Sequence, residues 1–171
     1  MEDLSLHILD IVENSISAGA KKVEIKIRED IKEDLLMIEI TDDGKGMDTE
    51  MLEKALNPFF TTKTVRKVGL GLSLLREAAR AANGDLCIES EVGRGARVKA
   101  TFQHSHIDRK PMGDMEKTII SLIIGNPEIQ IKYMHRKNDS EHIFDTKNLK
   151  AKGDLSSINI TELIKLIKES M

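Results

Sequence analysis

The stretch TDDGKGM, residues 41–47, places two carboxylates and two glycines directly after the apolar run LLMIEI. Aspartate followed by glycine is a common turn signal, because glycine accepts a positive φ at no steric cost. One turn needs only one glycine, whereas this stretch has both Gly44 and Gly46. A carboxylate fixed at a strand end, such as that of Asp42, can also accept a hydrogen bond from a ligand in a cleft. The stretch alone leaves a turn and a binding site as alternatives.

A second group of polar residues lies along a predicted helix. Apolar residues between Leu4 and Ala18 recur at helical spacing and form one face. On the other face, steps of three and four residues place polar side chains in a line. This line consists of His7, Asp10, Asn14 and Ser17. Without further context, an asparagine in the middle of a helix is an ordinary surface residue.

The elements that position these residues follow from periodicity and turn signals. Alternation with a period of two predicts adjacent strands at 21–29 and 35–41, joined as a hairpin. The elements expected after this hairpin are a short helix at 48–56, a loop at 57–69, a helix at 71–84 and strands at 85–91 and 96–102.

The polarity of the sequence rises near residue 105, where a proline and a glycine interrupt the pattern. We therefore expect two parts, residues 1–104 and a small αββα C-terminal extension at 105–171. The extension begins with the apolar helix MEKTIISLIIG, continues with a second hairpin and ends with the helix ITELIKLIKESM. Its helices carry more isoleucine and leucine than they can bury alone. Packing against the rest of the chain is the simpler expectation, and a homodimer or partner-protein interface is the alternative.

The composition excludes several classes of function. The chain has 26 basic and 29 acidic residues, a net charge of -3 and only 3% aromatic residues. It offers neither a clustered positive surface nor stacking platforms for nucleic acid. The lone Cys87 cannot form an internal disulfide, and no window approaches the roughly 18 consecutive apolar residues of a membrane span. We expect a soluble, cytoplasmic protein without nucleic-acid or membrane partners.

Four stretches stand in a fixed order, namely DIVENSISAGA, TDDGKGM, NPFFTTK with VGLGLSLL, and SEVGRGARV. Together they resemble the motifs of the GHKL superfamily, which comprises gyrase, a heat-shock chaperone, histidine kinases and MutL. The resemblance covers roughly residues 4–103, and PFFTTK and GLGLS are close to the histidine-kinase form. It implies the Bergerat fold, an α/β two-layer sandwich with a mixed, mainly antiparallel sheet and helices on one face, and it implies ATP and Mg as cofactors.

The resemblance gives roles to both groups of polar residues. Asp42 would accept a hydrogen bond from the adenine amino group, while Gly44 and Gly46 would let the backbone pass close beneath the base. Asn14 would coordinate, through its amide oxygen, the magnesium ion that bridges the phosphates. Magnesium prefers oxygen ligands and takes few of them from the protein. Asp43 is then left with turn chemistry.

Asp10 stands where relatives that hydrolyse ATP carry a glutamate, which makes it the candidate water-orienting base. Aspartate is one methylene shorter, and a general base must come within about 3 Å of its proton. We therefore expect weak intrinsic ATPase activity. Glu13 is turned about 100° away from Asn14 on the helix and is interpreted as a solvated residue. His7 lies on the same line as Asn14, but kinases of the family carry their phosphoacceptor histidine on a separate, preceding helix pair.

The loop from Asn57 to Val68 resembles the ATP lid of the family, with a phenylalanine pair as its apolar hinge. We expect Gly69 and Gly71 just before a helix, whose free N–H groups and positive dipole end form an anion site. The basic residues available to a terminal phosphate are Lys63, Arg66 and Lys67. The ATP-binding residues expected from this part of the chain are Phe59, Phe60, Thr62, Lys63, Gly69, Leu70, Gly71 and Leu72.

Two positions depart from the family pattern. Ser17 stands where relatives have Asp or Lys, and Ala96 stands where a threonine often follows the last glycine pair. These departures concern the phosphate contacts and the water network around adenine. The pair itself, Gly93 and Gly95, is interpreted as a turn that supports the pocket wall. Because Asn14 lies thirteen residues from the start, we expect no histidine-bearing dimerisation hairpin and hence not a complete sensor kinase.

Two functions remain open from the sequence. The first is a stand-alone, histidine-kinase-like domain that binds Mg-ATP and transfers a phosphoryl group to a protein in trans, with weak ATPase activity. Anti-sigma factors that phosphorylate a protein serine, and kinase halves that act on a separate histidine protein, are examples. The second is a nucleotide-gated protein-binding module with negligible turnover, in which ATP orders the lid. The fold alone does not identify the second substrate.

Overall fold

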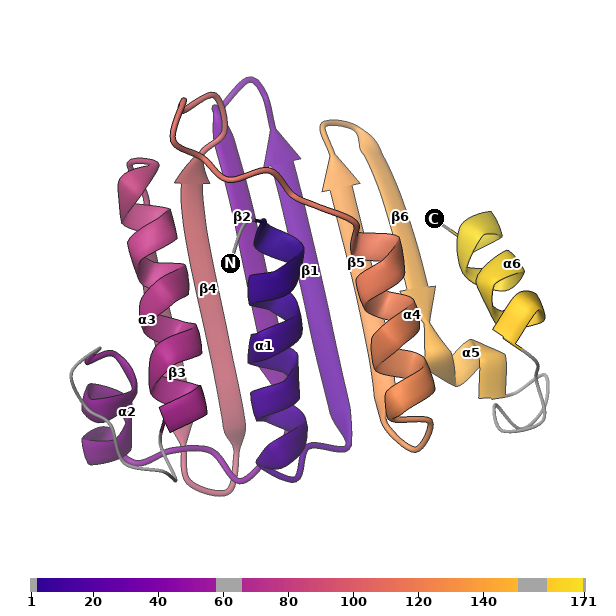
Figure 1. The fold of residues 1–171 in the computed structure, drawn as a ribbon, viewed down its shortest axis with the longest axis horizontal. Coiled ribbons are helices and arrows are strands. Elements are labelled where there is room, and N and C mark those ends of the chain that lie inside the picture. Colours follow the sequence, from indigo (N-terminus) through magenta and orange to yellow (C-terminus); the bar gives the residue numbers. More distant parts are fainter. Residues whose placement is uncertain (1–2, 58–65, 151–159, 171) are drawn as a thin grey trace.

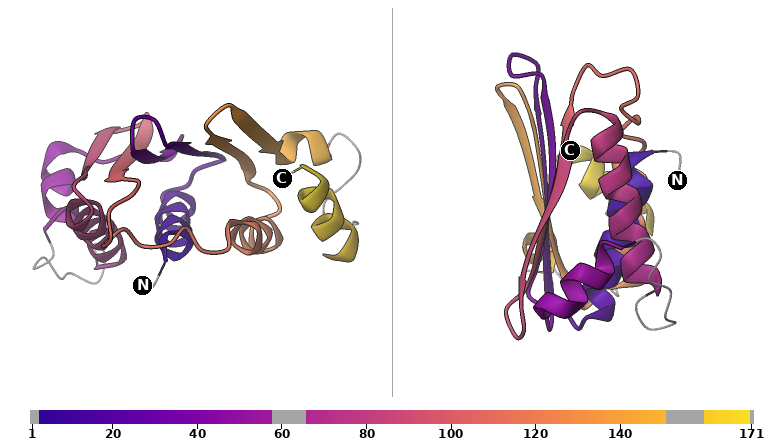
Figure 2. Two further views of the ribbon diagram at one scale, coloured as in Figure 1. Left: turned by 90° about the horizontal axis from the view of Figure 1, so that it is seen from above. Right: turned by 90° about the vertical axis from the view of Figure 1, so that its left-hand side faces the viewer.

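The computed structural model describes residues 3–57, 66–150 and 160–170, which form a six-stranded sheet covered by a layer of helices (Figure 1). The strand order is β3-β4-β2-β1-β5-β6, and α1, α3 and α4 lie side by side on one face of the sheet (Figure 2). The predicted two-layer α/β sandwich is thereby confirmed. No helix among these residues is long and apolar enough to cross a membrane. The elements are α1 (Leu4–Ser17), β1 (Lys22–Asp30), β2 (Leu35–Asp42), α2 (Thr49–Ala55), α3 (Arg66–Ala81), β3 (Asp85–Glu91), β4 (Gly95–Gln103), α4 (Met115–Gly125), β5 (Gln130–Lys137), β6 (Ser140–Asp145), α5 (Thr146–Lys150) and α6 (Ile160–Ser170).

The alternating sequence explains the central hairpin. β1 and β2 pair in antiparallel register, with Val23 opposite Asp42. Every second residue of these strands faces the helices, and most residues on that face are buried isoleucines, valines and leucines. The other face carries charges, such as the Glu39 carboxylate that pairs with Arg97 at 2.7 Å. A slip of one residue would exchange the two faces. Burial therefore fixes the register, and the register sets Asp42 at the end of β2.

The C-terminal extension continues the same sheet. β5 pairs in parallel with β1, so that Ile131 lies opposite Val23, and β6 forms the edge beyond it. α4, β5, β6 and α6 follow the predicted αββα order, with the short α5 in addition. Ile119 in α4 and Ile167 in α6 are fully buried within the chain, as the simpler packing expectation requires. The extension thus shares one core with the preceding residues, and its division from them at residue 105 stays a prediction.

Residues 104–114, here called the strap, cross from β4 to α4 over the start of α1 (Figure 1). Leu4 N in the first turn of α1 donates to Pro111 O at 2.9 Å. Ser5 N donates in the same way to Met112 O at 2.8 Å. The N-cap carboxylate of the helix accepts from the next N–H group. Because the first N–H groups of a helix have no partner within it, the strap completes the capping of α1.

A polar network joins β1, β5 and the strap at the end of the sheet away from Asp42. The Glu29 carboxylate lies 2.7 Å from His135 Nε2 and 3.1 Å from His104 Nε2. His135 Nδ1 lies 3.1 Å from the hydroxyl oxygen of the buried Tyr133. Burial alone would raise the pKa of Glu29, but the hydrogen bonds with the two imidazoles hold it below its usual value. The extension is therefore held by this network as well as by strand pairing.

His7 is an unexpected member of the core. Its side chain is 1% exposed, and neither ring nitrogen has a hydrogen-bond partner among the described residues. Burial, followed by the charge of Lys110, lowers the pKa of His7 to about 4, against a smaller opposing effect of Asp3. A buried, neutral imidazole cannot reach a phosphoryl donor without local opening. This position agrees with the interpretation that His7 is structural rather than a phosphoacceptor.

We expect His7→Leu to remove part of the stability that the chain loses on acidification. The folded-state pKa of His7, about 4, lies below its usual value of 6.5. Its contribution to the free energy of unfolding is therefore fully present above pH 6.5 and is lost as the pH falls toward 4. Between pH 7.5 and 4.5, the wild-type chain should lose about 2 to 3 kcal/mol more than the variant.

Urea unfolding at the two pH values measures this difference. His142 is exposed, so His142→Leu is the matched control and should keep the wild-type pH dependence. An equal acid-induced loss in the wild-type chain and in His7→Leu would contradict the prediction.

Candidate functional site

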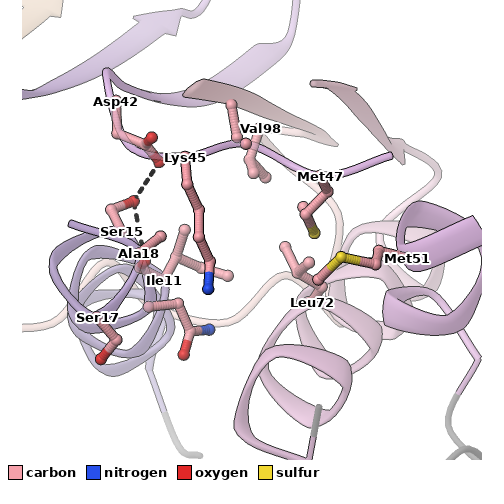
Figure 3. Close-up of a pocket in the computed structure, with 13 residues that line it drawn as sticks. Ile11, Ser15, Ser17, Ala18, Asp42, Lys45, Met47, Met51, Leu72 and Val98 are labelled. Carbon is pink, nitrogen blue, oxygen red and sulfur yellow. Dashed lines mark hydrogen bonds between the residues drawn. The ribbon is translucent and has the colours of Figure 1, made fainter. Parts of the chain in front are cut away.

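A cavity of about 210 Å³ opens between α1, α3 and the ends of β2 and β4 (Figure 3). Its walls are mainly apolar and carry a few polar groups, which is the usual composition of a small-molecule pocket. It brings together residues of the two polar groups found in the sequence. The lining residues are Ile11, Asn14, Ser15, Ser17, Ala18, Asp42, Lys45, Gly46, Met47, Met51, Leu72, Ala96 and Val98.

The Asp42 carboxylate is held in one orientation by two donors. Ser15 Oγ, from α1, donates to Asp42 Oδ2 at 2.6 Å (Figure 3). Gly44 N donates to Asp42 Oδ1 at 2.9 Å. A carboxylate has about four lone-pair sites, so each oxygen can accept a further hydrogen bond from a ligand in the pocket. Asp42 is therefore a preoriented acceptor, and Ser15 is the residue that positions it. The predicted contact of Asp42 with adenine stays a prediction.

The two glycines of the TDDGKGM stretch make contacts within the protein. Gly46 has a φ of +70°, and an added Cβ would clash with the carbonyl of Glu91. At Gly44, an added Cβ would lie 3.0 Å from Ala18 O. The segment is thus confined between the end of α1 and the β3–β4 turn, which explains why one glycine is not enough. The approach of a base to these glycines stays a prediction.

Asp43 anchors the start of β1. Its Oδ1 accepts hydrogen bonds from Lys21 N at 2.8 Å and Lys22 N at 3.0 Å. Partial burial acts to raise the pKa of Asp43, but the two backbone donors outweigh it and hold the pKa below its usual value. Asp43 therefore has a structural role beside the pocket, which extends its interpretation as a turn residue.

Asp10 and Asn14 face α3 where the two helices meet. At Gly71, an added Cβ would clash with the Asp10 carboxylate and would lie 3.6 Å from Asn14 Nδ2. Asn14 Nδ2 is buried and has no hydrogen-bond partner within the described ranges. Glu13 is exposed, as expected. Of the line of residues predicted from the sequence, α1 thus brings Asn14 and Ser17 to the pocket and Asp10 to its edge, whereas His7 is part of the core.

The donor set around Asn14 fits a magnesium ion better than a metal with many protein ligands. Across the described part of the chain, no three His, Cys, Asp or Glu side chains form a cluster that could hold a metal. A cation beside Asn14 and Asp10 would therefore take one or two protein oxygens and complete its shell with a ligand and water. This is the usual coordination of Mg²⁺.

The glycines of VGLGLSLL lie inside α3 and not ahead of it, which corrects the expected position. α3 begins at Arg66, so Gly69 belongs to its first turn and Gly71 to its second. Residues 57–69 show no clear periodicity, and the sequence prediction therefore starts the helix at residue 71. Glycine costs about 1 kcal/mol in a helix interior, and Gly71 allows α3 to approach the Asp10 side chain of α1 closely. The N–H groups free of helical partners are those of residues 66–69.

The other residues expected near the phosphates divide into two sets. Leu72 lines the pocket and is 3% exposed, while Gly69 and Leu70 are placed only by their position in α3. The predicted residues that lie outside the described ranges are Phe59, Phe60, Thr62 and Lys63.

Several pocket residues were missed by the sequence prediction. Ser15 carried a signal, because it is a hydroxyl residue on the apolar side of a helix, where a buried polar group needs a partner. Met47 and Met51 are apolar residues of a turn and a short helix, and no periodicity assigns them to a pocket. Lys45 stands between two glycines in the printed motif, where its side-chain direction cannot be inferred.

Comparisons with known proteins agree with this geometry. The sequence profile of the family described as histidine kinase-, DNA gyrase B-, and HSP90-like ATPase matches residues 2–106. Sensor kinase CckA of Brucella abortus is 32% identical over 106 residues, which are 59% of this chain and 11% of that protein. Sensor protein kinase FleS of Pseudomonas aeruginosa is 40% identical over 88 residues, which are 52% of this chain and 22% of that protein. The chain thus spans less than a quarter of the length of these relatives.

A solved structure extends the likeness in fold. The N-terminal domain of a DNA repair protein superposes with a TM-score of 0.55 at 15% identity, over 84% of this chain and 52% of that one. This coverage exceeds residues 2–106, so the shared fold includes part of the C-terminal extension. The sequence profile spans more than half of the chain, and the chain therefore belongs to the histidine kinase-, DNA gyrase B-, and HSP90-like ATPase family.

Proposed function

We propose that the pocket binds Mg-ATP and that the chain transfers the terminal phosphoryl group to a second protein. The observation that carries this proposal is the joint placement of Asp42 and Asn14. The preoriented carboxylate of Asp42 and the side-chain amide of Asn14 line one pocket, and Ser15 connects the elements that bear them. We assign the first to the base and the second to the metal ion. Membership of an ATPase family that includes histidine kinases supports the same function.

The base would bind against Asp42. Both carboxylate oxygens already accept one hydrogen bond and retain lone pairs for the adenine amino group. The apolar side chains of Met47, Leu72 and Val98 line the same pocket and can cover the base faces. Guanine carries a carbonyl in place of that amino group, which leaves the half-buried carboxylate of Asp42 unpaired, and a site of this kind discriminates between the two bases.

The phosphates would lie toward the junction of α1 and α3. Asn14 would hold a magnesium ion through its amide oxygen, and the bound ion would neutralise phosphate charge. The buried Nδ2 of Asn14 has no partner among the described residues and could donate a hydrogen bond to a phosphate oxygen. The free N–H groups in the first turn of α3 offer a further anion site.

The arrangement favours transfer to a protein over hydrolysis. In the transfer, a nucleophilic side chain attacks the terminal phosphorus, the bond to the bridging oxygen breaks, and ADP leaves. This chemistry depends mainly on positioning and charge neutralisation, which the pocket supplies. Hydrolysis also needs a base that orients water, and Asp10, packed against Gly71, is shorter than the glutamate of hydrolysing relatives.

A nucleotide-gated protein-binding module is the second candidate function. The observation in its favour is the strap, whose carbonyls cap the first turn of α1. α1 also carries Asn14, so a ligand that shifts α1 would act directly on residues 104–114. Such a module would bind ATP without turnover.

One experiment separates the two functions. ATP labelled at the terminal phosphate is incubated with the purified chain, with and without a nucleotide-depleted protein extract from the source organism, and bound ATP is measured in parallel. Label on an extract protein that depends on the wild-type chain and disappears with Asn14→Ala supports transfer in trans. Stoichiometric binding with no transferred or released label supports the gated module.

We expect Asp42→Asn to abolish ATP binding in practice while the fold is kept. The amide turns a donor toward the adenine amino group, and a mismatch of this kind inside the pocket costs about 2 to 3 kcal/mol, or some 30- to 150-fold in affinity. Isothermal titration calorimetry with Mg-ATP measures the loss. Asp43→Asn is the matched control, because Asp43 holds β1, and its affinity should stay at the wild-type value. Wild-type affinity in Asp42→Asn would refute the assignment of the pocket.

We also expect intrinsic hydrolysis slower than about one turnover per minute, and we expect Asp10→Glu to increase it. Loss of an effective general base typically costs about 10²- to 10⁴-fold, and the longer side chain would restore part of that factor. Phosphate release under single-turnover conditions gives the rate. Glu13→Asp changes an exposed neighbour and should leave the rate unchanged. A fast wild-type rate, or a slower rate in Asp10→Glu, would contradict the role of Asp10.

A further inference from the structure

We propose that Lys45 binds the phosphates of the nucleotide from the base side of the pocket, a role that rests on the proposed function above. Lys45 lies between Gly44 and Gly46 and lines the cavity. In Figure 3 its side chain extends from the end of β2 across the pocket, on the side of Ile11 in α1. The ammonium group is therefore directed over the cavity, although the residue as a whole is exposed.

The backbone of Lys45 is held from both sides. Lys45 N donates to Ala18 O, at the end of α1, at 2.9 Å. Lys45 O accepts from Gly93 N, in the β3–β4 turn, at 2.7 Å. Because these two hydrogen bonds hold the backbone, the position and direction of the Cα–Cβ bond are fixed. The side-chain torsions alone remain free. This anchoring makes Lys45 part of the pocket frame rather than of a surface loop.

The charge of Lys45 has no partner inside the described part of the chain. Of the described residues that line the pocket, Lys45 alone is cationic, and its ammonium takes part in none of the ion pairs found among those residues. Lys54 and Lys26, by contrast, pair with glutamates at 2.9 and 4.0 Å. An ammonium group is a compact point charge that binds phosphate readily.

The lysine side chain has an apolar stem and a charged ammonium group, and its length lets the two contact different parts of a ligand. The four-carbon stem lies beside the apolar side chain of Ile11 (Figure 3), while the ammonium reaches beyond the base. The same ammonium could instead lie over the face of the adenine ring as a cation–π contact. The two positions of the ammonium differ in the ligands whose binding they strengthen. A contact with phosphate strengthens the binding of nucleotides alone, whereas a contact with the ring strengthens the binding of a nucleoside to the same extent.

The test compares ligands with and without phosphate on the full chain. Calorimetry with adenosine, ADP and Mg-ATP is carried out on the wild-type chain and on Lys45→Met, which keeps the length of the stem and removes the charge. We expect roughly tenfold weaker binding of ADP and Mg-ATP and unchanged binding of adenosine, because one charge-assisted contact at a partly exposed position is lost. The affinity of the variant for Mg-ATP should also fall less steeply with added salt.

Lys99→Met is the matched control, since Lys99 lies on the opposite face of the sheet among the residues of β3 and β4. It should bind all three ligands like the wild-type chain. Equal affinity of Lys45→Met and the wild-type chain for Mg-ATP would overturn the inference while the proposed function stands. An equal loss for adenosine and Mg-ATP would overturn it in favour of contact with the base. If the wild-type chain binds none of the three ligands, the proposed function fails as well.

Discussion

The hydrogen bond from Ser15 Oγ to Asp42 Oδ2, 2.6 Å long, joins α1 to the end of β2. α1 carries Asp10 and Asn14, and the end of β2 carries the preoriented carboxylate of Asp42, so this contact sets the distance between the two halves of the site. A helix rises 1.5 Å per residue, and a shift of α1 by one residue would break the bond. The strap holds the other end of the helix through the N–H groups of its first turn. With both ends held, α1 can present core residues to the sheet and polar residues to α3 at the same time.

Glycines allow the walls of the pocket to approach this closely. Gly46 lies against the carbonyl of Glu91, and Gly71 lies against the carboxylate of Asp10. Gly95, with a φ of +83°, lies against the backbone of Asp42, in agreement with its interpretation as a turn that supports the wall. A methyl group at any of these positions would separate two elements that line or border the cavity. The glycine motifs are therefore explained first by packing within the protein, and the predicted approach of phosphate or base uses the space that this packing leaves.

The sequence predicted those features that depend on neighbouring residues. Period-two alternation gave the β1–β2 hairpin, and helical spacing placed Asp10 and Asn14 on one line. Features that depend on distant contacts were not accessible. The alternating pattern of β5 indicates a strand but does not indicate which strands lie beside it. Its antiparallel pairing with β6 follows from the short turn between them, whereas its parallel pairing with β1 could not be inferred. Likewise, residues 57–69 show no clear periodicity, so the start of α3 at Arg66 could not be inferred. Ser15 combines the two cases. Its position on the apolar side of the helix indicates burial, but nothing in the sequence indicates its partner Asp42, 27 residues away.

β1 is the element through which the nucleotide site and the C-terminal extension are connected. It pairs with β2 on one side and with β5 on the other, and Val23 lies opposite both Asp42 and Ile131. The strap forms a second connection, because it caps the helix that carries Asn14. β1 is hydrogen-bonded to a strand on each side, whereas among the described residues two backbone hydrogen bonds join the strap to the first turn of α1. A ligand affects a distant element only through contacts that differ between its two states. If the chain is the nucleotide-gated module proposed above, contacts between α1 and the strap are the ones that bound nucleotide would have to change in order to act on residues 105–171.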